Sequence, residues 1–133
     1  MSSCNNNKAL FVDSNKHSHV TIGAHFERTI NVDVTDNGVT SARNYNSITL
    51  SGCIDAKDAD NNDLNISLAE VADEVTTGIY KVDANHWKFI VSESTSLSVV
   101  SGIYNFVIYG VPADNKKYVE LHGKIEFKEV AEC

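Results

Sequence analysis

Two segments in the last third of the chain decide the fold, GIYNFVIY at residues 102–109 and YVELHGKIEFKEV at residues 118–130. In the second segment, every other position is apolar or glycine: Val119, Leu121, Gly123, Ile125 and Phe127. Such alternation is typical of a β-strand with one buried face. Residues 111–117, VPADNKK, hold the only proline of the chain. We expect them to join the two strands into a long antiparallel hairpin.

Alternating segments of the same kind lie upstream. Residues 24–34 place five side chains on one predicted inner face: Phe26, Arg28, Ile30, Val32 and Val34. Asp36-Asn37-Gly38 is a turn signal, because Asn and Gly tolerate positive φ. Further strands are predicted at residues 8–12, 47–55 and 64–68, with a hairpin formed by 78–82 and 86–91. Residues 69–75 are too short for a helix to be predicted.

The composition also favours β-structure. Val, Ile and Thr supply 33 residues, against 16 for Leu and Ala. β-branched side chains fit a pleated sheet and lose rotamer freedom in a helix. We therefore predict an all-β protein, an antiparallel β-sandwich of seven to nine strands with Greek-key connections. The sandwich is expected to form a single domain over residues 8–133, after a flexible N-terminal tail at residues 1–7.

The charge of the chain argues against several classes of partner. The formal net charge is −7 at pH 7, with only two arginines. Nucleic-acid binding needs a basic face, so no nucleic acid is expected, and anionic membranes are disfavoured for the same reason. No stretch approaches the ~20 apolar residues of a membrane span, and the N-terminus, MSSCNNNK, lacks an apolar signal core. We expect synthesis in the cytoplasm without a signal peptide, and no membrane partner.

Side chains that bind metals are present but poorly arranged. Asp58, Asp60 and Asn62 have the spacing of the first EF-hand ligands, yet the glycine and the bidentate glutamate of such a loop are missing. A solvated turn is the preferred interpretation. His17 and His19 would share a strand face but lack a fixed third zinc ligand. No metal and no cofactor are therefore expected.

The sequence also contains nucleophilic and aromatic side chains of the kinds that active and binding sites use. The three cysteines, Cys4, Cys53 and Cys133, make a poor disulfide framework, and we expect reduced thiols. No nucleophile elbow, HExxH, P-loop or GxGxxG motif occurs, so we expect neither enzyme activity nor catalytic residues. One group of aromatic residues would stack on sugar rings if several shared an exposed platform: Tyr45, Tyr80, Trp87, Tyr109 and Tyr118. Core packing is the preferred interpretation for Trp87.

The C-terminal half resembles a known family of virion domains. Thr95 and Leu97 precede Gly102-Ile103-Tyr104-Asn105-Phe106, and His122-Gly123-Lys124-Ile125-Glu126-Phe127 follows after a short loop. This order is similar to that of the Ig-like β-sandwich domains of tailed-phage virion proteins, above all the N-terminal domains of upper baseplate and tail-fibre attachment proteins. The similarity extends over roughly residues 22–130.

The resemblance implies an Ig-like fold and a non-enzymatic structural protein of the phage virion. Such a module would dock onto tail, baseplate or capsid, with other virion proteins as partners, and would form a homo-oligomer in the particle. The alternative function is a carbohydrate-binding or host-surface adhesin module.

One strand offers a candidate interface. If Tyr104, Phe106 and Ile108 face the core opposite Trp87 and Phe89, the outer face of the same strand carries Ile103, Asn105, Val107 and Tyr109. An apolar outer face needs a cover. The cover is either the segment around residues 10–12 or a neighbouring subunit. The neighbour is the preferred one, so we predict an interface that includes Ile103, Val107 and Tyr109.

Overall fold

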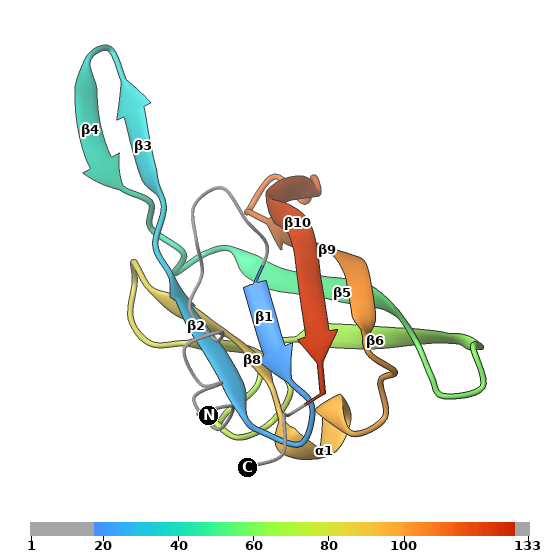
Figure 1. The fold of residues 1–133 in the computed structure, drawn as a ribbon. Coiled ribbons are helices and arrows are strands. Elements are labelled where there is room, and N and C mark those ends of the chain that lie inside the picture. Colours follow the sequence, from blue (N-terminus) through green and yellow to red (C-terminus); the bar gives the residue numbers. More distant parts are fainter. Residues whose placement is uncertain (1–17, 130–133) are drawn as a thin grey trace.

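The computed structural model describes residues 18–129, which form an all-β sandwich of ten strands with one short helix (Figure 1). The larger sheet has five strands in the order β1 (Ser18–Thr21), β10 (Tyr118–Lys128), β9 (Gly102–Val111), β5 (Thr49–Lys57) and β6 (Asp63–Ala69). The smaller sheet has the order β2 (Phe26–Ile30), β8 (Trp87–Val91) and β7 (Gly78–Lys81). A separate two-stranded hairpin is made by β3 (Asp33–Asp36) and β4 (Val39–Ala42).

The predicted terminal hairpin is present as β9 and β10. The two strands are antiparallel, with Phe106 opposite Gly123 and Tyr104 opposite Ile125. Every paired strand in the described part is antiparallel except β1, which runs parallel to β10 at the edge of the larger sheet. Residues 78–82 and 86–91 also form the predicted hairpin, as β7 and β8.

The core lies between the two sheets. The ring of Phe106 on β9 lies 5.2 Å from that of Phe89 on β8, which in turn meets Phe26 edge-on at 6.0 Å. Phe106, Ile108, Trp87 and Phe89 are all buried, and Tyr104 packs against them partly buried. The predicted inner face of this strand is therefore confirmed, and core packing is confirmed for Trp87.

The single strand predicted over residues 24–34 is wrong, because the chain changes sheets within it. β2 ends at Ile30, and β3 begins at Asp33 and pairs only with β4. Val34, which was predicted to face the core, is 39% exposed. An alternating pattern records which side chains share a face, but it does not reveal which sheet a strand joins. The apolar alternation therefore continues from Ile30 to Val34, although the chain leaves the smaller sheet between these residues and enters the β3–β4 hairpin.

The unbroken alternation predicted along residues 118–130 is also wrong. A β-bulge shifts the register between Val119 and Leu121, so that Val119 is 56% exposed while Ile125 is fully buried. Glu120 is the extra residue of the bulge. Since a bulge re-aims the side chains around it, Glu120 is free to turn toward the core side of the strand.

Two short segments connect strands of the sandwich. Sequence patterns did not predict α1 (Glu93–Ser96), which Ser92 caps by accepting a hydrogen bond from the Thr95 backbone N–H at 3.2 Å. Residues 69–75 contain bends rather than a helical turn. The strand predicted at residues 8–12 lies outside the described residues.

The packing of Phe106 gives the first prediction. Phe106→Ala should lower the free energy of unfolding by about 3–5 kcal/mol, because it leaves a cavity between the two sheets. The matched control is Ile103→Ala on the opposite face of β9, where the side chain is 53% exposed, and the expected cost is below about 1 kcal/mol. Urea unfolding measures both. Equal losses would contradict the assignment of the two faces.

Candidate functional site

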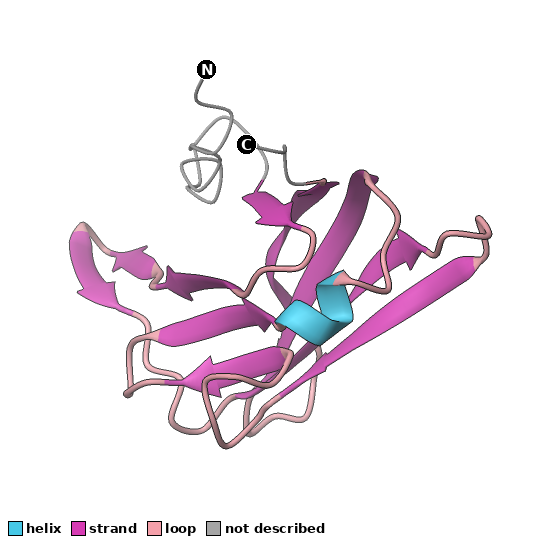
Figure 2. Ribbon diagram, turned by 60° about the horizontal axis from the view of Figure 1, so that its bottom comes forward, coloured by secondary structure: helices cyan, strands magenta, loops and turns pink. Residues whose placement is uncertain are grey.

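The β3–β4 hairpin, residues 33–42, projects from the body of the protein and is called the arm below (Figures 1 and 2). All eight of its strand residues are exposed. Its tip is the predicted turn, in which Asn37 and Gly38 have φ values of 52° and 80°. Two successive residues with positive φ match the type I′ turn that the twist of a hairpin favours.

The two faces of the arm differ in chemistry. In the β3–β4 register, Val34 lies opposite Ser41 and Asp36 lies opposite Val39. Since residues two apart share a face, these four form one face, which carries both valines of the arm. Val34 is 39% exposed and Val39 is 67% exposed. The arm thus presents an apolar face with one carboxylate to solvent.

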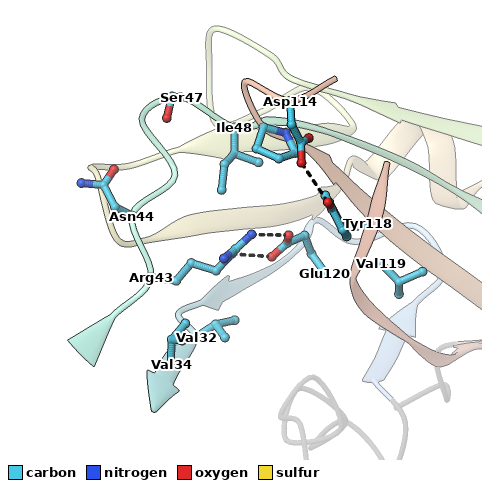
Figure 3. A pocket seen from close by; sticks show the side chains of 11 residues that line it. Val32, Val34, Arg43, Asn44, Ser47, Ile48, Asp114, Tyr118, Val119 and Glu120 are labelled. Carbon is cyan, nitrogen blue, oxygen red and sulfur yellow. Dashed lines mark hydrogen bonds and ion pairs between the residues drawn. The ribbon is translucent and has the colours of Figure 1, made fainter. Parts of the chain in front are cut away.

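A groove of about 640 Å³ lies beside the base of the arm (Figure 3). One wall is formed by the residues on either side of the arm and by its first strand, and the other wall by the β9–β10 connection and the start of β10. The lining residues are Val32, Val34, Arg43, Asn44, Ser47, Ile48, Pro112, Asp114, Tyr118, Val119 and Glu120.

An ion pair crosses this groove. The Nε and Nη2 atoms of Arg43 donate to the two carboxylate oxygens of Glu120, each at 2.8 Å. The Glu120 side chain is only 6% exposed, whereas that of Arg43 is 29% exposed. These hydrogen bonds raise the pKa of Arg43. A two-pronged contact of this kind fixes orientation as well as distance, so it ties the base of the arm to the bulge of β10.

A glycine makes room for the buried carboxylate. A Cβ atom on Gly110 of β9 would lie 2.7 Å from Oε2 of Glu120 and 2.9 Å from a methyl carbon of Ile48. Any larger residue at this position would force the ion pair or the groove wall to move. Gly110 therefore belongs to the site, although it touches no groove surface itself.

Tyr45 holds the arm to the smaller sheet. The Arg43 guanidinium lies 5.6 Å from the centre of the Tyr45 ring, and that ring meets Trp87 edge-on at 6.1 Å. Tyr45 is fully buried, and burial raises its pKa. Lys81 also donates to the backbone carbonyls of Tyr45 and Ile48. The base of the arm is therefore fixed, while its length extends free of the body.

The opposite wall of the groove is apolar and exposed. Tyr118 is 46% exposed and Val119 is 56% exposed. The Tyr118 hydroxyl donates to Asp114 at 2.8 Å, and this hydrogen bond raises the pKa of Tyr118. Together with Val34 on the facing wall, these are three of the eight large apolar side chains exposed in the described residues, and all three line the groove. Such clustering is typical of a protein interaction site.

The three predicted interface residues lie on the outer face of the larger sheet. Ile103 is 53% exposed, and Val107 and Tyr109 are half-buried. Tyr109 pairs across the strands with Val119 of the groove wall, and Lys117 lies 4.7 Å above its ring. Ile103 is six residues further along β9, about 20 Å away. The structure thus brings Tyr109 to the groove but not Ile103.

The other candidate residues do not converge on a site. The Asp58 carboxylate accepts hydrogen bonds from the backbone of Asp60 and Asn62, as the turn interpretation predicts. In residues 18–129, no three His, Cys, Asp or Glu side chains lie together as metal ligands would. Cys53 is half-buried on β5, opposite Val107. The predictions for Cys4, Cys133, His17 and residues 10–12 lie outside the described residues.

Sequence reasoning missed the groove itself. The arm was foreseeable only in part, from the Asn37-Gly38 turn. Arg43 and Glu120 are 77 positions apart, and neither belongs to a recognisable motif. The one available signal is the glutamate that interrupts the alternating strand at position 120.

Comparisons with known proteins leave the fold and the groove as the basis for a functional argument. No protein-family model and no curated protein matches the chain. No helix within residues 18–129 is long and apolar enough to cross a membrane.

The ion pair gives the second prediction. Arg43→Met should lower the free energy of unfolding by about 2–3 kcal/mol, because it leaves the Glu120 carboxylate buried without its partner. The expected loss is smaller than the roughly 3–5 kcal/mol lost when a fully buried ion pair is broken, because the Arg43 side chain is partly solvated. Adding Glu120→Gln should recover part of the loss. Chemical denaturation of both variants is the measurement.

The control is Lys57→Met, which breaks the exposed pair between Lys57 and Asp63. An exposed pair contributes below about 1 kcal/mol. If Arg43→Met costs no more than this control, the ion pair does not anchor the arm.

Proposed function

We propose that this protein is a non-enzymatic structural module of a tailed-phage virion that assembles with other virion proteins through the arm and the adjoining groove. The observation that carries the proposal is the arm itself. Ten consecutive residues form a hairpin that adds nothing to the core, since none of the buried core residues comes from positions 33–42.

An isolated arm of this kind favours assembly on physical grounds. A two-stranded hairpin is marginally stable in water when nothing packs on it. Both of its outer edges also expose unpaired backbone groups, because neither β3 nor β4 pairs with a further strand in the described part of the chain. A partner that covers the valine face or extends the hairpin would stabilise it.

The chemistry of the groove supports binding rather than catalysis. Arg43 and Glu120 neutralise each other as an ion pair, and the Asp114 carboxylate accepts a hydrogen bond from the Tyr118 hydroxyl. The Tyr118 hydroxyl does lie beside the Asp114 carboxylate, but both residues are exposed and the contact raises the pKa of Tyr118, which disfavours the nucleophilic phenolate. What remains available to a partner is apolar surface, from Val34, Tyr118 and Val119.

The virion assignment rests on the resemblance of residues 22–130 to Ig-like domains of tailed-phage proteins. The strand order Gly102 to Phe106 followed by His122 to Phe127, on which that resemblance depends, corresponds to the paired strands β9 and β10. The carbohydrate-binding alternative loses two of its five candidate aromatic residues, because Trp87 and Tyr45 are fully buried and present no ring face to a sugar.

Replacement of the arm tests the proposal. The backbone N–H of Arg43 donates to the carbonyl of Val32 at 2.8 Å, so a two-residue Asn-Gly turn fits in place of residues 33–42. The shortened protein should unfold within about 1 kcal/mol of the natural chain, because no core residue is lost. It should nevertheless fail to enter phage particles or to associate in light scattering. Undiminished assembly would overturn the proposal.

The predicted sheet interface needs a separate test. In Val107→Asp/Tyr109→Asp, the protein should stay folded and lose association, because charge is placed where a neighbour would cover apolar side chains. The matched control, Asn65→Asp/Ser67→Asp, adds the same charge to exposed positions of β6 on the same outer face. Normal association of the first variant would exclude this face as an interface, and unfolding would show that it is covered from within.

A further inference from the structure

We infer that the partner of the arm is a second copy of this chain, and that two copies exchange arms about a two-fold axis, each arm occupying the groove of the other. The inference rests on the proposed assembly function and names its partner. It follows from a match between the arm and the far wall of the groove in both apolar surface and charge.

The apolar surfaces match because each copy carries both halves of the contact. The valine face of the arm holds Val34 and Val39, and the far wall of the groove holds Tyr118 and Val119. In one copy the arm projects outward (Figure 1), while Val34 at its base lines the groove beside Val32 (Figure 3). A surface with both halves is self-complementary, as a two-fold contact requires.

The charges select a second copy over a generic apolar partner. The arm carries Asp33 and Asp36 and no cation, and neither carboxylate has an ion pair within residues 18–129. Lys57, Lys81 and Lys88 each have a carboxylate partner. The described lysines that have none all lie on β10 or on the connection before it: Lys116, Lys117, Lys124 and Lys128.

Two of these lysines adjoin the far wall of the groove in sequence, although neither is among the residues that line it. Lys116 and Lys117 immediately precede Tyr118, and Lys117 lies over the Tyr109 ring rather than against an acid. The only acid on this connection, Asp114, is engaged by the Tyr118 hydroxyl. An arm from a second copy that lays its valine face on this wall would bring Asp36, the carboxylate on that face, toward these two ammonium groups, while Asp33 lies on the other face of the arm and adds to its negative charge. In a protein with a net charge of −7, this acidic arm meets few other basic surfaces.

Charge reversal in trans tests the exchange. In the arm variant, Asp33→Lys/Asp36→Lys, both the arm and the far wall are basic. In the wall variant, Lys116→Asp/Lys117→Asp, both are acidic. Each variant alone should show a dimer dissociation constant raised at least tenfold, because like charges meet in both contacts. An equimolar mixture should restore dimers, because each arm then meets a wall of opposite charge.

Two controls carry the same changes in charge at places away from the groove. Asp60→Lys/Glu93→Lys matches the arm variant, and Lys124→Asp/Lys128→Asp matches the wall variant. Light scattering of the full chain, with the mass followed over a concentration series, should find natural dimerisation in both controls.

Three results would overturn the inference: a natural chain that stays monomeric at millimolar concentration, variants that dimerise like the natural chain, or a mixture that does not recover. If the arm is needed for entry into particles and yet the mixture does not recover, the arm binds a different virion protein. In that case the assembly function stands and the second copy does not.

Discussion

The ion pair between Arg43 and Glu120 is the constraint on which the site depends. It joins the residue directly after the arm to the bulge of β10, and so couples the arm to the larger sheet although its two strands pair with neither sheet. Tyr45 and Lys81 complete the same anchor from the side of the smaller sheet. Because a buried carboxylate without its partner is strongly unfavourable, the pair fixes the direction in which the arm leaves the body. Because the base of the arm is already fixed, less conformational freedom would be lost when the exposed length of the arm is bound.

The sequence predicted the sandwich well, because the sandwich follows from local patterns. Period-2 alternation identified β9, β5 and β6 and the faces they bury, and it placed Phe106 opposite Phe89. The alternation was misleading where a single alternating segment contributes to two different strands. From Phe26 to Val34 the apolar positions continue in phase, although the first half packs on the core and the second half enters the arm. The fate of a strand after it leaves its sheet depends on the neighbours it meets, and those are distant in sequence.

The site was harder to predict than the fold for a related reason. Its outer parts were visible as Asn37-Gly38 and as the apolar outer face with Tyr109, which does adjoin the groove. The centre of the site was not visible, because a single glutamate inserted into a regular strand looks like a small irregularity. The bulge makes it a buried anchor for an arginine 77 positions away. Gly110 shows the same dependence, since its lack of a side chain matters only once Glu120 and Ile48 surround it.

The parallel pairing of β1 with β10 has a consequence for how the protein acquires its fold. Ser18 pairs with Ile125 and Thr21 with Lys128, so the first described strand can pair only after the last one has been synthesised. During synthesis, the chain emerges from its N-terminus, and residues 18–21 have no strand to join until nearly the whole domain has left the ribosome. Contacts between residues so far apart in sequence also form slowly. The edge of the larger sheet is therefore the last part of the sandwich to be completed in a newly made chain.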